Sequence, residues 1–96
     1  MKQVILRREA RADTLEAYQW YEKQEPGLGA GFRDELRATI QRIRANTLGY
    51  RVVYRETRRA RLKRFPCGVF FREFPDAIVV VAVMHTRRHP KRWQRR

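Results

Sequence analysis

The sequence predicts an α+β domain in which a helical hairpin packs on a mainly antiparallel sheet of four or five strands. Three observations lead to this fold class. A short β-branched segment comes first, two helical patterns separated by a Pro-Gly turn follow it, and the second half consists of strand-like segments ending in an uninterrupted apolar run. The predicted order is β-α-α-β-β-β, and residues 1–96 are expected to form a single domain.

The first predicted strand and helix lie near the N-terminus. Residues 3–7 (QVILR) are rich in branched aliphatic side chains and predict a strand. Asp13 followed by Glu16 resembles a capping box, although the helix can also begin a turn earlier, near Glu9. The Pro-Gly pair at 26–27 ends the helical pattern, because proline disfavours helix in the residue before it and glycine favours a turn.

The second predicted helix spans residues 28–45 and has the clearer amphipathic pattern. Its apolar residues recur at spacings of four, four and three, which places them on one face: Phe32, Leu36, Ile40 and Ile43. The connection between the helices is short, so they are expected to form an antiparallel hairpin. The apolar face of this hairpin needs a sheet to cover.

The sheet is expected to form from the second half of the chain. Its three predicted strands span residues 59–65, 68–74 and 77–84, with a turn at 75–76, and residues 51–56 are the candidate for a fifth, short or edge strand of the sheet. The last strand (AIVVVAVM) is apolar on both faces, which is typical of a central strand that is covered on both sides.

Basic side chains are expected to gather on the sheet face away from the helices. Alternate side chains of a strand point to opposite faces, so if Leu62 packs beneath the helices, the other face carries Arg59, Arg61, Lys63 and Phe65. Three separated basic segments are therefore expected to converge on one concave region that binds the target, formed by Arg59, Arg61, Lys63, Arg72, Arg87, Arg88 and Trp93.

The distribution of charge indicates a polyanionic partner. Residues 1–50 carry a net charge of +2, whereas residues 51–96 carry +11 of the total +13. Such asymmetry favours nucleic acid, a ribosome, a nucleoprotein enzyme or an acidic protein as partner. A solvated basic face that serves solubility alone is the other interpretation.

Composition also restricts the setting of the protein. The single cysteine, Cys67, cannot form an internal disulfide, and no spacing of His, Cys or Asp resembles a metal site, so no metal or cofactor is expected. The apolar runs are too short for a signal peptide or a membrane span. A cytoplasmic protein without membrane contact is expected.

Two kinds of function suit the basic surface. Cleavage of RNA by attack of a 2′-hydroxyl needs an acid, a base and cations, for which the candidate catalytic residues are Arg61, Lys63, His85 and Arg87. Binding without chemistry uses the same cations. Trp93 is interpreted as a packing anchor more than as a base-stacking platform, and residues 94–96 as a loose tail. The acidic residues of the first helix are interpreted as caps or a solvated face, away from the basic surface: Glu9, Asp13, Glu16 and Glu22.

Several motifs together resemble the RelE/ParE superfamily of bacterial toxins. They are a Tyr-rich first helix (18–21), LGxxF opening the second helix (28–32), FP-x-x-V-x-F across a strand pair (65–71), and H-x-R-R-x-P-x-x-W (85–93). Their order and spacing cover nearly the whole chain. The ending resembles ParE-like members more than RelE-like nucleases.

The resemblance implies a toxin of a type II toxin–antitoxin pair. A cognate antitoxin with an acidic or amphipathic segment would neutralise it, and operator DNA would be contacted only through the antitoxin. ParE-like members inhibit DNA gyrase, which makes gyrase inhibition the favoured function. RelE-like members cleave mRNA on the ribosome, and a ribosome-dependent endonuclease is the alternative. A non-toxic RNA-binding module is the third.

Overall fold

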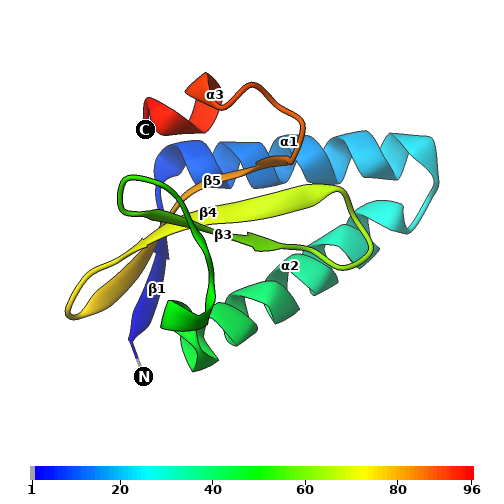
Figure 1. The fold of residues 1–96 in the computed structure, drawn as a ribbon. Coiled ribbons are helices and arrows are strands. Elements are labelled where there is room, and N and C mark those ends of the chain that lie inside the picture. The colour runs from blue at the N-terminus through cyan, green and yellow to red at the C-terminus, as the bar shows by residue number, and fades with distance from the viewer. Residues whose placement is uncertain (1) are drawn as a thin grey trace.

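A computed structural model describes residues 2–96 as a helical hairpin on one face of a five-stranded sheet, with a short C-terminal helix on the other face (Figure 1). The sheet order is β1-β5-β4-β3-β2, in which β1 runs parallel to β5 and the other neighbours are antiparallel. The elements are β1 (Gln3–Leu6), α1 (Arg8–Gln24), α2 (Leu28–Ala45), a 3-10 turn (Thr47–Gly49), β2 (Val52–Tyr54), β3 (Thr57–Arg61), β4 (Cys67–Glu73), β5 (Ala77–His85) and α3 (Lys91–Gln94). The predicted fold class is confirmed.

The helical hairpin is closed by one carboxylate and two glycines. Glu22, near the end of α1, accepts hydrogen bonds from the backbone N–H groups of Gly27 and Gly29, both at 3.0 Å. Gly27 has a φ of 91°, which glycine adopts without strain. A Cβ at position 29 would lie 2.7 Å from the carbonyl oxygen of Tyr18, so a glycine is needed where the helices approach each other.

The main core lies between the hairpin and the sheet. The predicted stripe of α2 supplies the fully buried Phe32 and Ile43, which pack with Val69, Phe71 and Val80 from the sheet. Apolar contact of this kind removes roughly 1.5–3 kcal/mol of hydration cost per large side chain. This core holds the strands that carry the basic side chains.

A second core lies on the opposite face of the sheet and depends on a bulge in β5. Phe70 pairs with Ala82 and Phe71 with Val80, so Val81 has no partner in β4. Val81 and Ala82 therefore face the same side, where they pack with Phe70 and Trp93. The last predicted strand is an interior strand covered on both sides, as expected, and β5 lies between β1 and β4.

Three local predictions are wrong. The capping box at Asp13 is absent, because α1 begins at Arg8, close to the earlier start that the sequence also allowed, and Arg7 caps it without a side-chain bond. β3 ends at Arg61 rather than continuing to residue 65, since the chain turns there and the Leu62 amide donates to the Cys67 carbonyl at 2.9 Å. Phe65 consequently packs in the main core with Leu62 and does not share the basic face.

Glu35 ties the β3–β4 connection to α2. Only 8% of its side chain is exposed, and it accepts bonds from the Arg64 backbone N–H at 2.8 Å and from Arg64 Nε at 2.9 Å. Burial raises the pKa of Glu35, but bonds from the Arg64 amide and guanidinium and from the Lys63 backbone outweigh it. The pKa therefore lies below its usual value of 4.5.

Replacing Glu35 with glutamine is expected to lower the free energy of unfolding by about 1–3 kcal/mol at neutral pH. Because the folded-state pKa is depressed, the stabilisation by the carboxylate is complete above 4.5 and disappears as pH falls through the folded-state value. Urea denaturation of wild type and variant across this range should show their difference shrinking below about pH 4.5. Glu56→Gln, at an exposed position, is the control, and a difference that is constant with pH would contradict this account.

Candidate target-binding surface

Three of the predicted site residues meet in a hollow where β3 and β5 end. Arg61 is the last residue of β3 and His85 the last of β5, while Arg87 follows two positions later. The hollow has a volume of about 380 Å³, and its remaining lining residues are Leu62, Phe65, Pro66, Cys67 and Thr86. None of these residues carries a carboxylate. The hollow is called the Arg61–His85–Arg87 hollow below.

The hydrogen bond of His85 determines which of its ring nitrogens can donate. His85 Nδ1 accepts a bond from the Arg87 backbone N–H at 3.0 Å. In the neutral ring, Nε2 then carries the hydrogen and is a donor. All three residues therefore carry side-chain hydrogen-bond donors, and the lining of the hollow contains no carboxylate. Such a set is suited to holding an anion.

Positive charge is crowded on the sheet face beside the hollow. The pKa of Arg59 is lowered, first by burial and then by the nearby guanidinium groups of Arg61 and Arg51. The side chain of Arg59 lies across β4, so that a Cβ at Gly68 would be 3.1 Å from Arg59 Cγ. Arg59 and Arg61 point away from the helices as predicted, because Ala60 between them is buried in the main core. This face repels cations and attracts anions.

The other predicted surface residues do not join the hollow. Lys63 is exposed on the β3–β4 connection and does not line it, while Arg72 donates from Nε to Thr57 Oγ1 at 3.1 Å. Arg88 pairs with Glu16 at 3.5 Å. Trp93 is only 6% exposed and stacks on Phe70 with 4.4 Å between ring centroids, so it is a packing anchor and its ring is not free to stack on a base.

An apolar cavity lies next to the hollow, between α1 and the end of β5. Its volume is about 390 Å³, and much of its lining is apolar, including Ala17, Trp20 and Met84. Its ionisable lining residues include two carboxylates as well as basic groups: Asp13, Glu16, His85, Arg87 and Arg88. Tyr21 Oη lies 3.6 Å from Cys67 Sγ. Burial raises the pKa of both groups, so both are neutral at physiological pH and neither is an activated nucleophile.

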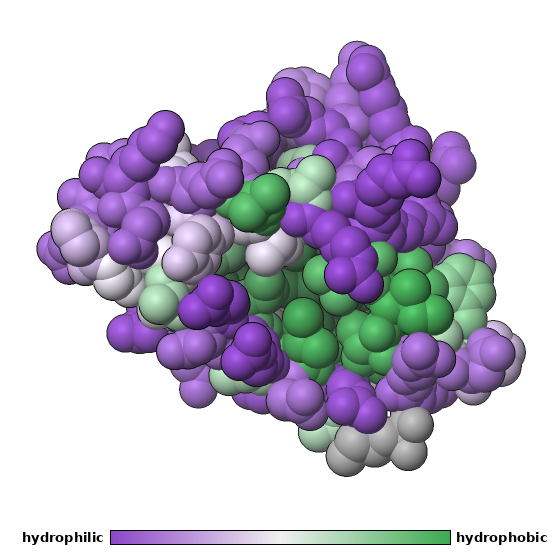
Figure 2. Space-filling model, turned by 180° about the vertical axis from the view of Figure 1, so that it is seen from behind, coloured by the Kyte–Doolittle hydropathy of each residue, from purple (hydrophilic) through white to green (hydrophobic). Residues whose placement is uncertain are grey.

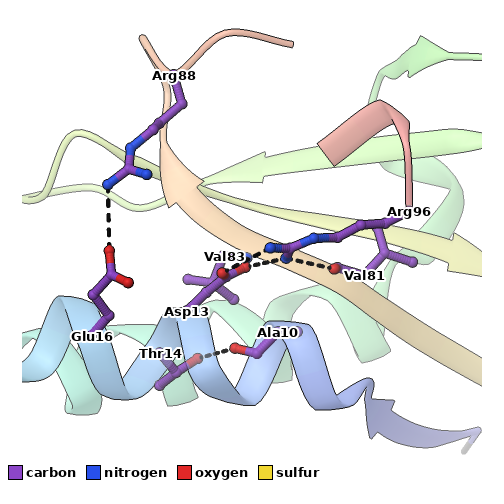
Figure 3. Close-up of polar contacts among 8 residues, drawn as sticks. All are labelled: Ala10, Asp13, Thr14, Glu16, Val81, Val83, Arg88 and Arg96. Carbon is purple, nitrogen blue, oxygen red and sulfur yellow. Dashed lines mark hydrogen bonds and ion pairs between the residues drawn. The ribbon is translucent and has the colours of Figure 1, made fainter. Parts of the chain in front are cut away.

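Sequence reasoning missed a polar junction between α1, β5 and the C-terminal segment. Asp13 accepts the backbone N–H of Val83 at 3.0 Å and both terminal nitrogens of Arg96, one of them at 3.1 Å. The Arg96 guanidinium also donates to the Val81 carbonyl at 3.2 Å (Figure 3). Asp13 is thus neither a helix cap nor a solvated residue, and Arg96 does not belong to a loose tail. Glu16, which was also expected to lie away from the basic surface, contacts Arg88.

A further apolar area lies on the side opposite to the view of Figure 1. There apolar side chains gather in a hollow with hydrophilic side chains around it (Figure 2). Apolar residues that remain partly exposed at the margin of the main core include Val4, Leu6 and Ile40. Contiguous exposed apolar surface is typical of a protein-binding site.

The comparisons with known proteins identify the family. Residues 4–90 match the family described as "ParE toxin of type II toxin-antitoxin system, parDE". The chain belongs to the ParE toxin family. The resemblance inferred from the sequence is therefore confirmed, including its ParE-like side, and the protein is a type II toxin.

A solved structure supports the fold of this ParE-family toxin. A chain from the "Chromosomal ParDE TA system from P. aeruginosa" superposes with a TM-score of 0.79 at 17% identity, covering 88% of this chain and 96% of that one. No curated protein sequence matches. Within residues 2–96, no helix has the length and apolarity to cross a membrane, and no group of three or more His, Cys, Asp or Glu is placed to hold a metal ion.

Proposed function

We propose that this ParE-family toxin inhibits DNA gyrase by binding to it, and that a cognate antitoxin neutralises the toxin. The resemblance to ParE-like members implies gyrase as the target. The observation that supports binding is the Arg61–His85–Arg87 hollow, whose lining brings together three residues with side-chain donors and contains no carboxylate. A binding inhibitor needs a fixed cationic surface, and the ends of β3 and β5 provide one.

The proposed antitoxin would cover apolar surface and offset positive charge. Trp20 is 57% exposed although it lines the cavity between α1 and β5, and the apolar hollow in Figure 2 is surrounded by hydrophilic side chains. The net charge of +13 favours an acidic partner. Both features support an amphipathic antitoxin segment with carboxylates beside its apolar residues.

Ribosome-dependent cleavage of mRNA is the second candidate, and one observation favours it. Arg61, His85 and Arg87 are three of the four residues that the sequence assigned to catalysis, and they line the same hollow. The fourth, Lys63, lies outside it. In this alternative His85 would have to give up its bond to the Arg87 amide before its Nδ1 could exchange a proton.

Induced expression in bacterial cells tests these functions. Gyrase inhibition is expected to cause filamentation and a DNA-damage response while transcripts stay intact, and co-expression of the antitoxin is expected to restore growth. The double variant Arg61→Gln/Arg87→Gln should lose most of the growth inhibition. Arg11→Gln/Arg37→Gln removes two charges from exposed helix positions and should retain it. Rapid arrest of translation with cleaved transcripts would instead support the nuclease, and normal growth would contradict both toxic functions.

A further inference from the structure

We infer that the Arg61–His85–Arg87 hollow holds a phosphate group of a nucleic-acid backbone. This inference deepens the proposed function and rests on it, because gyrase acts while bound to DNA and a toxin at that complex has backbone phosphates within reach. The binding group would be a phosphodiester, held by two guanidinium groups and one imidazole N–H. The protein would thus contact both the enzyme and its DNA.

The donor set of the hollow fits a phosphate. Guanidinium groups match phosphate geometry with paired N–H donors, and bonds from charged donors are roughly twice as strong as neutral ones. Arg61 and Arg87, which line the hollow from different segments, carry two such groups, and His85 at the end of β5 carries a third donor at Nε2 when its ring is neutral. The Thr86 amide donates to the Pro66 carbonyl at 2.9 Å, which fixes the segment that carries these groups.

No carboxylate lines the hollow itself, although Asp13 and Glu16 line the adjoining apolar cavity together with His85 and Arg87. Three carboxylates of the helices are paired with arginines that do not line the hollow: Glu35 with Arg64, Glu16 with Arg88 and Asp13 with Arg96. Beside the hollow, burial lowers the pKa of Arg59 most, and the positive charges of Arg61 and Arg51 lower it further, so Arg59 and Arg61 repel each other. An anion in the hollow would reduce this repulsion, and the released counterions would favour binding of a polyanion.

The two histidines of the chain provide an internal control for a direct test. His89 is also exposed, and its Nδ1 accepts the Lys91 amide at 3.2 Å just as His85 Nδ1 accepts the Arg87 amide, but His89 does not line the hollow. The full chain would be titrated with inorganic phosphate and, separately, with a DNA duplex of about 20 base pairs, while the imidazole resonances are followed by NMR. We expect His85 to shift with saturation in both titrations and His89 to shift much less.

Each outcome of the titration is informative. A His85 shift with duplex DNA supports the inference, whether or not free phosphate binds tightly enough to be seen. A shift with phosphate alone would overturn the nucleic-acid assignment, because the hollow would then bind only a small anion. Equal shifts of both histidines would overturn the site, since binding would follow the net charge. A parallel titration with single-stranded RNA that shifts His85 more than DNA does would overturn DNA as the ligand.

A second experiment uses matched charge variants. Fluorescence anisotropy with labelled duplex is expected to show that Arg61→Gln/Arg87→Gln raises the dissociation constant at least about ten-fold at 0.1 M salt and reduces the slope of log K against log salt by about 2. Arg11→Gln/Arg37→Gln removes the same charge from α1 and α2 and is expected to change both values much less. Equal weakening by the two variants would contradict a defined site.

Failure of the inference can be distinguished from failure of the proposed function. If the wild-type toxin inhibits gyrase and the hollow variants bind DNA as wild type does, the phosphate site is wrong and gyrase inhibition stands. If the His85 resonance responds to DNA but gyrase is unaffected, the site stands and the proposed target is wrong.

Discussion

Replacing Trp93 with alanine is expected to lower the free energy of unfolding by about 3–5 kcal/mol. The Trp93 ring stacks on Phe70 and meets the Tyr54 ring edge-on, with 4.4 Å and 6.0 Å between centroids. It covers the second core, to which the bulge of β5 contributes the buried side chains of Val81 and Ala82. Without the indole, this apolar face would be open to water. Because a domain of this size has a total stability of roughly 5–15 kcal/mol, urea denaturation should detect a large loss.

The other tryptophan of the chain is the matched control. Trp20 lies on α1 with 57% of its surface exposed, and Trp20→Ala is expected to change the free energy of unfolding by no more than about 0.5 kcal/mol. The two variants remove the same side chain from a buried and an exposed site. Equal losses would contradict the assignment of Trp93 as the anchor of the C-terminal segment.

Replacing Asp13 with alanine is the second substitution with a large expected effect, about 2–4 kcal/mol of stability. The side chains of Asp13 and Arg96 are 14% and 19% exposed, so the pair is largely screened from water. The variant leaves the Val83 amide without its acceptor and the Arg96 guanidinium without its counter-charge (Figure 3). Thermal and urea unfolding would measure the loss.

Glu16→Ala is the control for Asp13→Ala. The Glu16 side chain is 72% exposed, its contact with Arg88 is 3.5 Å, and exposed pairs of this kind contribute about 0–1 kcal/mol. A double-mutant cycle of Asp13 and Arg96 should give a coupling energy above about 1 kcal/mol. A coupling near zero, or equal losses for Asp13→Ala and Glu16→Ala, would show that the junction does not secure the C-terminal segment.

The fold was largely predictable because its signals are local. The stripe of α2 is set by spacing within one helix, and residues 28–45 were predicted with the observed bounds. The bulge at Val81 and Ala82 was not predictable. Every residue of β5 near it is apolar, so the sequence contains no alternation of polar and apolar residues whose interruption would mark a bulge. The end of β3 was not predicted. Strand alternation places Leu62 and Phe65 on opposite faces, whereas both pack in the main core because the chain turns after Arg61.

The site was predictable only in part. Arg61, His85 and Arg87 were placed together because they end or follow strands that share the sheet. Lys63 and Arg72 were included on strand alternation alone, and neither lines the hollow, since Lys63 is exposed on the β3–β4 connection and Arg72 donates to Thr57. The junction of Asp13 with Arg96 joins residues 83 positions apart, and a helix-surface aspartate and a terminal arginine carry no pattern that predicts a pair.

The most direct test of binding inhibition is a supercoiling assay with purified gyrase, relaxed plasmid and the purified toxin. Wild type and Arg11→Gln/Arg37→Gln are expected to block supercoiling to the same extent, while Arg61→Gln/Arg87→Gln requires at least about ten-fold more protein, in line with the loss of two phosphate contacts. The same preparation is expected to leave mRNA on programmed ribosomes intact. Normal supercoiling together with cleavage of ribosome-bound mRNA would contradict the account.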